Sequence, residues 1–511
     1  MALVNKIDSN ITGLRYAEEA SIKTLPGSPV WYPLEPNSYS DFGGEITTIA
    51  RDPINPSRQR KKGVTTDLDA TGGFNTDLTQ KNVQDLMQGF MYADARHKVQ
   101  FGGAGEITNV DGTGEDFEAA SGLDAFSAND LVLAAGFSVS QNNGLHLVTS
   151  AAATSLTVGS DLADETPPAT ATLQQVGVQG AAGDLDVDAS GALPLITSTS
   201  LDFTTLGIIP GEWIFVGGDT AGTRFATAAN NGFKRVRAVT ANALTIDKSS
   251  TTMATEASTT ETVRIFFGSV IKNESGSLIK RRTYQLERTL GAPDDSLPNE
   301  IQAQYIIGAV PNTVAVNVAQ ADKVTLDLDF LGTDSETIDG PTALKTGARP
   351  AIVEAAAFNT SSDFSRIKLS VIDASANPSP LFAFVTELTV NINNNLTANK
   401  AVSVLGAFDV TAGTFEVGAT LSAYFADVAA IGAIRDNEDV TLDMHLVKEN
   451  AGITIDMPLV SLGDGRPDVE KDAAIIIPLT LEAADGSKVD PALDHTLLWV
   501  FWHYLPDAAD V

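Results

Sequence analysis

The sequence predicts a mainly β protein, and two observations support this prediction. Short segments in which apolar and polar residues alternate are separated by clusters of Gly, Asn, Asp and Thr. The alternation gives each segment one apolar face and one polar or acidic face, as in a strand that lies on a core. The clearest of these segments span residues 314–318, 324–330, 387–392 and 440–444.

Two further segments have the spacing of helices. In the first, apolar residues fall at positions 83, 86, 87, 90 and 91, which form one stripe on a helix. Thr79 precedes this stripe and is the expected N-cap. A weaker helix is expected through Phe425, Val428, Ile431 and Ile434. We expect both stripes to pack on a sheet.

Composition limits the function classes. The chain has 511 residues, which suggests about two to four domains, and 43% of them are hydrophobic, so real cores are expected. Lys and Arg total 33 against 65 Asp and Glu, a net charge of −32, which argues against sequence-specific binding of DNA or RNA. Apolar runs are too short for a membrane span, and the first ten residues lack the apolar core of a signal peptide. We therefore expect folding in a cytoplasm.

The sequence carries no pattern typical of an enzyme. The absence of Cys excludes disulfides and thiolate chemistry, and the five His lack metal-ligand spacing. Residues 184–188 resemble a calcium loop, but Ala189 and Leu195 stand where such a loop needs Gly and Glu. Aromatic residues make up only 7% of the chain, few for the sugar cleft of a polysaccharide hydrolase. We predict no catalytic residue, no cofactor and no metal.

An inserted region with an internal repeat is predicted in the first half. No Lys or Arg occurs between Lys98 and Arg224. The triplet Asn142-Asn143-Gly144 recurs as Asn230-Asn231-Gly232, 88 positions later, each time before a similar alternating segment. Asn-Gly between such segments is typical of a tight turn. We predict two small β modules, at 101–180 and 181–268.

A longer repeat relates the two ends of the chain. Glu45-Ile46-Thr47 corresponds to Glu387-Leu388-Thr389 at a shift of 342, and residues 324–328 resemble residues 475–479. Gly72 and Phe74 correspond to Gly413 and Phe415 in the same order. We therefore predict a first domain at 1–100 plus 269–342, interrupted by the insertion, and a second copy of it at 343–511.

Several motifs in these outer domains resemble a known family. They are residues 46–53, 58–63 and 66–70, then the run Gly72-Gly73-Phe74-Asn75-Thr76-Asp77-Leu78 before a helix, and later residues 387–396, 413–415 and 424–425. Over about 340 residues, this pattern resembles the major tail (tail tube) proteins of long-tailed phages.

The resemblance implies both a fold and an assembly. Each outer domain would be a tail-tube-type β-sandwich flanked by a helix, whose sheet joins neighbouring copies into a closed barrel ring. Two tandem domains per chain favour a homotrimeric ring of pseudo-hexameric shape, with a hexamer as the alternative. Stacked rings would form the virion tail tube through which DNA is ejected, assembled in the host cytoplasm beside tape measure, tail tip and tail terminator proteins. The alternative function is a β-module adhesin, or a decoration protein that binds a receptor or glycan.

Two sets of residues are candidates for assembly roles. The scarce basic residues are candidates for contacts between rings, because rings of an acidic chain need opposite charges to stack. These are Arg58, Arg60, Lys61, Lys62, Lys280, Arg281 and Arg282. Polar strand faces are candidates for the tube lumen, at Asp67, Asp69, Thr325, Asp327 and Asp329. A solvated charged loop and ordinary solvated strand faces remain the alternatives.

Overall fold

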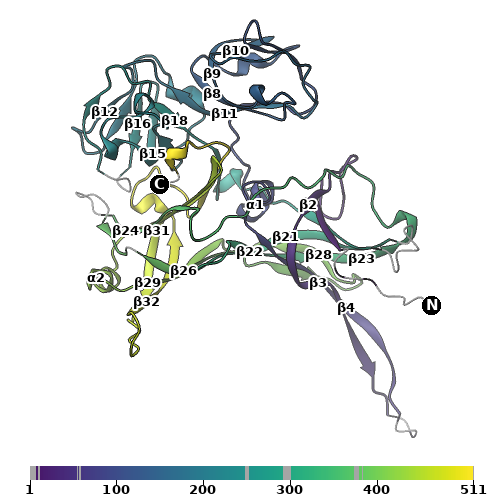
Figure 1. Cartoon of the computed structure of the whole chain (residues 1–511). Coiled ribbons are helices and arrows are strands. Elements are labelled where there is room, and N and C mark those ends of the chain that lie inside the picture. Colours follow the sequence, from purple (N-terminus) through teal and green to yellow (C-terminus); the bar gives the residue numbers. More distant parts are fainter. Residues whose placement is uncertain are drawn as a thin grey trace. The chain divides into compact units, whose positions relative to one another are not determined.

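The computed structural model describes residues 7, 9 and 12–509, apart from 55, 57–58, 248–251, 292–300, 373–378 and 383. Contacts group the chain into two compact units (Figure 1). Unit 1 contains residues 1–93, 274–360 and 386–421, and unit 2 contains residues 94–273, 361–385 and 422–511. The boundaries of these units differ from those of the four predicted domains, which remain a prediction.

The predicted mainly β fold class is confirmed. Strands form large antiparallel sheets in both units, and the described residues contain two α-helices. Within the described part of one chain, no sheet closes into a barrel.

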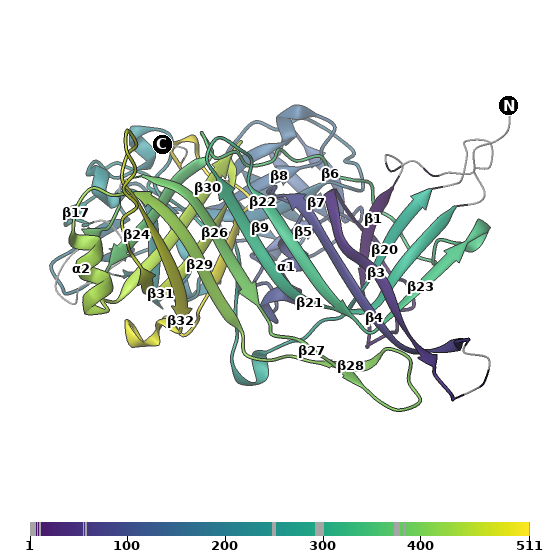
Figure 2. The same cartoon turned by 90° about the horizontal axis from the view of Figure 1, so that it is seen from below.

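Unit 1 is built around one long strand. Its strands are β1 (Gly13–Glu18), β2 (Tyr32–Leu34), β3 (Pro36–Arg51), β4 (Lys61–Asp77), β20 (Tyr284–Gly291), β21 (Gln302–Ala319), β22 (Thr325–Gly332), β23 (Asp334–Asp339), most of β26 (Val385–Asn393), β27 (Thr397–Lys400) and β28 (Ala407–Thr411). The first half of β21 pairs with β20 and β23, and its second half pairs with β22 and β26. β4 then pairs with both β22 and β3, and Figure 2 shows these strands side by side.

The strands of unit 2 that follow residue 360 repeat this plan. They are β24 (Phe364–Val371), β25 (Ser379–Pro380), β30 (Val440–Lys448), β31 (Ala451–Asp464), β32 (Ile476–Ala484) and β33 (Leu498–Trp502), while β29 (Glu416–Tyr424) crosses the boundary between the units. The order of pairing is β25, β24, β30, β31, as it is β2, β1, β20, β21 in unit 1. β31 also divides its partners, with β33 on its first half and β32 on its second.

The two halves agree in register as well as in order. In unit 1, Leu286 of β20 lies opposite Ile306 of β21. In unit 2, Leu442 of β30 lies opposite Met457 of β31. Since register decides which side chains face the core, this agreement means that equivalent positions in the two units have equivalent orientations.

The two helices also correspond. Helix α1 (Gln84–Met91) and helix α2 (Ala429–Asp436) each have eight residues and end on a residue in the left-handed conformation, Tyr92 and Asn437. α1 packs on β21, and α2 packs on β31. The prediction that Thr79 caps the first helix is wrong, because α1 begins at Gln84 after Val83 and has no side-chain cap. In the segment before the helix, the Asn82 side chain accepts a hydrogen bond from the backbone N–H of Thr79 and donates one to the backbone oxygen of Asp77.

The inserted region forms one continuous antiparallel sheet. Its path is β17-β12-β13-β16-β15-β14-β18-β11-β8-β9-β10-β7-β6, with β5 beside β11. β6 to β11 and β12 to β18 pair internally in the same way, and β11 joins β18 at the centre. The bounds are β5 (Gln100–Gly102), β6 (Ile107–Asp111), β7 (Asp116–Ala119), β8 (Asp130–Ala135), β9 (Gly144–Ala152), β10 (Ser155–Val158), β11 (Thr172–Gln179), β12 (Asp186–Asp188), β13 (Leu195–Thr197), β14 (Trp213–Val216), β15 (Gly232–Thr240), β16 (Ala243–Ile246), β17 (Glu256–Ala257), β18 (Arg264–Phe266) and β19 (Ser269–Lys272).

The repeated Asn-Asn-Gly triplets make the same contacts in both modules. The Asn143 side chain bonds the backbone N–H and C=O of Phe137, and Asn231 does so at Phe225. The prediction of a tight Asn-Gly turn is wrong, because Asn143 is extended at φ −94° and only Gly144 has a positive φ, at 115°. The hairpin turns lie instead between β9 and β10 and between β15 and β16.

The inserted sheet and the last strands of unit 2 share a core. Trp213 and Phe233 from the insertion pack in one cluster with Leu498 and Trp502 of β33. All five residues of β33 are buried, so the C-terminal aromatic run forms a buried strand. The polar face expected on β30 is also buried, since Asp443 and its neighbours lie at 0–2% exposure beneath these aromatic rings.

Candidate assembly surfaces

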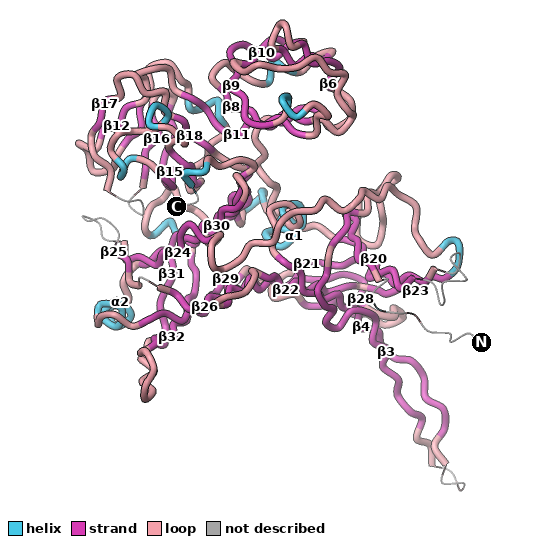
Figure 3. Tube along the Cα trace, viewed as in Figure 1, coloured by secondary structure: helices cyan, strands magenta, loops and turns pink. Residues whose placement is uncertain are grey.

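The most exposed feature of unit 1 is a hairpin that we call the arm, residues 45–51 of β3 with residues 61–67 of β4. Figures 1 and 3 show these two strands running together away from the rest of the unit. Every residue from 45 to 51 is exposed, and Ile46, Ile49 and Val64 each expose more than half of their surface. Monomeric proteins rarely keep a long apolar hairpin in water, so the arm is a candidate interface.

The basic residues predicted for ring contacts divide into two groups. Arg60, Lys61 and Lys62 are exposed at the end of the arm, where β4 begins, while Arg58 lies outside the described residues. These three cations give the arm a basic end on an otherwise acidic chain.

The second basic cluster is largely engaged inside unit 1. The guanidinium of Arg281 pairs with Asp409 at 2.7 Å. Arg282 is buried, and it donates to the backbone oxygen of Ala93 at 2.9 Å and pairs with Glu18. Lys280 is exposed, and its backbone N–H donates to the oxygen of Tyr92 at 2.8 Å. Arg281 and Arg282 therefore stabilise the fold around α1.

The candidate lumen residues of β22 share one face of a sheet. Leu326, Leu328 and Phe330 point to the core, so Thr325, Asp327 and Asp329 point to the other side. Asp327 accepts hydrogen bonds from Asn75 and Asn317 on the two neighbouring strands, each at 2.7 Å. Partial burial raises the pKa of Asp329, although hydrogen bonds oppose the shift.

A shallow hollow of about 340 Å³ lies on this face. Its lining comes from β3, β21, β22 and β26 and combines hydroxyl, amide and carboxylate groups with small apolar side chains. The lining residues are Ser40, Thr313, Val314, Ala315, Asp327, Leu328, Asp329, Asn391, Ile392 and Asn393. None of them is a cation, so the hollow offers hydrogen bonds but no binding site for phosphate.

Asp67 and Asp69, the other two lumen candidates, are held by one lysine. Lys400, the last residue of β27, places its ammonium 2.5 Å from Asp67 and 2.6 Å from Asp69. The hydrogen bond from Lys400 lowers the pKa of Asp67, and the two carboxylates raise the pKa of Lys400. These contacts of Lys400 fix the base of the arm.

A buried ion network in unit 2 was not predicted from the sequence. The guanidinium of Arg235 on β15 pairs with Asp247 at 2.5 Å and with Asp456 of β31 at 3.0 Å, and all three side chains are at most 5% exposed. Burial alone would lower the pKa of Arg235, but the two carboxylates raise it. The only signal in the sequence was the group of three cations, Lys234, Arg235 and Arg237, between apolar residues at 233–239.

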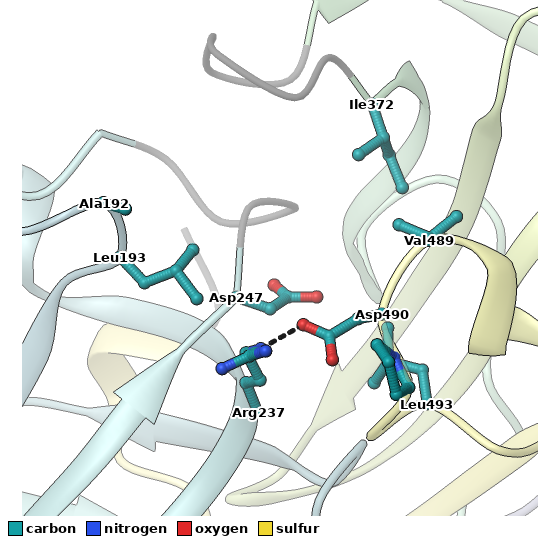
Figure 4. A pocket seen from close by; sticks show the side chains of 9 residues that line it. Ala192, Leu193, Arg237, Asp247, Ile372, Val489, Asp490 and Leu493 are labelled. Atoms are coloured by element: carbon teal, nitrogen blue, oxygen red, sulfur yellow. Dashed lines mark hydrogen bonds and ion pairs between the residues drawn. The ribbon is translucent and has the colours of Figure 1, made fainter.

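A cavity of about 320 Å³ lies beside this network (Figure 4). Arg237 faces Asp490 across its floor, and the two form an ion pair. The remaining walls are mostly apolar, with Leu193, Ile372 and Val489. Among the described residues of its lining, the cation of Arg237 is therefore neutralised by a carboxylate of the same wall.

Metal and membrane features were searched over the described residues. No group of three or more His, Asp or Glu there is arranged to hold a metal ion. Asp184, which begins the calcium-like segment, is instead saturated by Ser198, Thr199 and Ser200. Among the described helices, none is long and apolar enough to cross a membrane.

Comparison with known proteins gives one clear result. The family model described as phage tail tube protein matches residues 9–483, which is most of the chain. A search of curated proteins returned no match. The match spans both units, including the duplicated strands and the inserted modules. The chain therefore belongs to the phage tail tube protein family, whose members are structural components of the virion tail.

Proposed function

We propose that three copies of this chain form a ring of pseudo-sixfold shape, and that stacked rings make the tail tube through which DNA leaves the virion. The observation that carries this proposal is the duplicated pairing of strands in the two units. A chain with two equivalent sheets supplies two of the six positions in such a ring, so three chains complete it. A hexamer of this chain would instead hold twelve sheets.

The polar face of β22 forms the lumen wall in this proposal. Double-stranded DNA carries one phosphate charge per ~1.7 Å of axis, so exposed cations along its path would retain it. On this face the carboxylates of Asp327 and Asp329 lie among neutral amides and hydroxyls. Nearby Lys323 is paired with Asp77 at 2.7 Å. The surface favours passage of DNA without binding.

The basic end of the arm contacts the acidic surface of the next ring. The chain has a net charge of −32, so identical rings repel one another unless cations face carboxylates across the contact. Arg60, Lys61 and Lys62 are exposed and placed for that task. One exposed pair contributes only about 0–1 kcal/mol, so the contact depends on repetition around the ring.

The same proposal places the chain beside other tail proteins. Tape measure, tail tip and tail terminator proteins would fill and end the tube, and assembly would take place in the host cytoplasm. DNA would pass without sequence-specific contacts, and the chain itself would act by assembly alone, with no enzymatic step.

Native mass spectrometry of the purified, assembled protein tests this proposal. The expected repeating species contains three chains of 53.6 kDa each, and larger species are whole multiples of it. A repeating species of six chains would support the hexamer alternative. A chain that stays monomeric both alone and in the presence of a tail tip complex would overturn the proposal.

A further inference from the structure

In unit 1, one edge of β21 is filled by a strand from the second half of the chain. Residues 387–393 of β26 pair antiparallel with residues 313–319, so that Leu388 lies opposite Val318 and Asn393 opposite Thr313. β22 occupies the other edge of the same segment. Leu388 and Val318 are both buried as a result, at 0% and 7% exposure.

Unit 2 contains the equivalent edge at the end of β31. Asn317 of β21 lies opposite Thr325 of β22, and Asp468 forms a bridge with Ile476, the first residue of β32. β31 ends at Asp464, which lies opposite Leu479, whereas Leu328, the equivalent of Leu479, lies opposite Val314. Unit 2 therefore has one extra residue between Asp464 and Asp468, and residues 468–470 correspond to residues 317–319.

The strand that corresponds to β26 is β3. Glu45-Ile46-Thr47 matches Glu387-Leu388-Thr389 in sequence, and both strands precede the helix of their half. The ladder partners of residues 45–51 lie in β4, which occupies one edge of β3. A strand has two edges, so the arm can add to a second sheet.

Exposure differs between the two halves in a complementary way. Ile46 is 58% exposed where its equivalent Leu388 is buried, and Val469 is 70% exposed where Val318 is buried. Two further pairs of equivalent residues differ in the same way. Val428 and Ile475 are exposed in unit 2, whereas Val83 and Val324, their equivalents in unit 1, are buried. One half thus exposes the apolar residues of the added strand, and the other half exposes those of the edge that receives it.

We propose that the arm strand of β3 adds to the edge beyond the end of β31 in the next copy of the chain, with Ile46 opposite Val469 as Leu388 lies opposite Val318. This inference rests on the proposed ring and names the strand and the edge that close it. Opposed apolar pairs are among the pairs that stabilise antiparallel strands.

A cysteine pair tests this register directly, because the natural chain has no cysteine. Ile46→Cys and Val469→Cys are introduced together, and assembled rings are treated with a mild oxidant. Directly opposed residues have Cβ atoms about 4.5–5.5 Å apart, close to the separation that a disulfide needs. The expected product on a non-reducing gel is a closed covalent trimer that returns to monomer on reduction.

The matched control moves one cysteine along the same strand. Ile49 is as exposed as Ile46 but lies three residues further along the strand, so Ile49→Cys with Val469→Cys should give no trimer. Each variant is first checked for rings by electron microscopy. Rings that form without the Ile46–Val469 link, or a covalent ladder that extends beyond trimers, would overturn the register. Failure of the natural chain to form rings would instead count against the proposed function.

Discussion

Arg235 is the centre of a buried ion network in unit 2. Its guanidinium joins Asp247 in the insertion to Asp456 of β31, and it lies over the ring of Trp213. A buried charge is tolerated only when its partners satisfy it, so each member of the network depends on the others. The alternating pattern of the sequence could not reveal this, because the pattern treats every arginine as a surface residue.

Replacing Arg235 should strongly destabilise unit 2. Arg235→Ala leaves two buried carboxylates without a cation, and we expect a loss of about 3–5 kcal/mol in the free energy of unfolding. Tryptophan fluorescence in urea reports this, since three of the four Trp lie in unit 2. The matched control is Arg237→Ala, which removes a partly exposed ion pair and should cost about 0–1 kcal/mol. Equal effects of the two substitutions would contradict the account.

Asp184 should make the stability of the second module depend on acid pH. Burial favours a raised pKa, but hydrogen bonds from Ser198, Thr199 and Ser200 lower the pKa of Asp184 to about 2. Because this value is below the unfolded value of about 3.9, the stabilisation is complete above about pH 4 and is lost as pH falls toward 2.

The test compares urea unfolding of the natural chain and Asp184→Asn between pH 2 and 6. The variant should be less stable by about 1–3 kcal/mol near pH 6, and the difference should shrink as the pH falls. Asp124→Asn, an exposed aspartate in the first module, should follow the natural chain throughout. A difference that stays constant with pH would refute the role of the Asp184 carboxylate.

At the scale of elements, the two modules of the insertion share an Asn–Glu pair that is hydrogen-bonded to the backbone. Asn142 donates to Glu165 at 2.8 Å, and Asn230 donates to Glu256 at 2.7 Å. Each glutamate also accepts two backbone N–H groups from the segment before its triplet. Because both modules contain this Asn–Glu pair, the segment before β9 and the segment before β15 have the same arrangement.

Removing the asparagine of this Asn–Glu pair should have the same effect in either module. Asn142→Ala and Asn230→Ala each remove hydrogen bonds to a partly buried carboxylate and to the backbone, so each should lower the stability of its module by about 1–3 kcal/mol. Hydrogen exchange resolved by peptide measures this, with faster exchange confined to 137–165 in one variant and to 225–256 in the other. Equal loss of protection from hydrogen exchange in both modules would show that each Asn–Glu pair does not stabilise its own module alone.

The sequence predicted both helices and several of the longer strands, because their patterns depend on local alternation and spacing. β21, β22, β26 and β30 all lie where alternating segments occur. Three features escaped prediction for physical reasons. The start of α1 depends on Asn82 rather than Thr79, the polar face of β30 is covered by aromatic residues distant in sequence, and Lys400 acts through carboxylates more than 300 positions away. Long-range partners leave no periodic signal.

The candidate surfaces were predicted unevenly. The face that carries Thr325, Asp327 and Asp329 follows from alternation alone, and the exposed Arg60, Lys61 and Lys62 follow from their place between two strands. Arg281 and Arg282 looked the same in sequence, yet they bind groups within unit 1. Clustered charges indicate a basic patch, but only the fold decides which of them face solvent.

For the whole molecule, charge at the end of the arm should control stacking but not ring formation. Replacing Arg60, Lys61 and Lys62 by Glu reverses the sign of that end, so rings should form while tubes should not. Negative-stain microscopy counts both species, and the same positions changed to Gln should give shorter tubes that are more sensitive to salt. Normal tubes from the Glu variant would exclude these residues from the contact between rings.

The symmetry of the tube tests the central claim most directly, because the claim is that one chain supplies two equivalent positions in a ring. Cryo-electron microscopy of tubes assembled from the natural chain should show threefold rings in which six similar sheets surround the channel. The inserted modules should then appear three times per ring. Rings with six copies of the insertion, or an assembly without a central channel, would contradict the account.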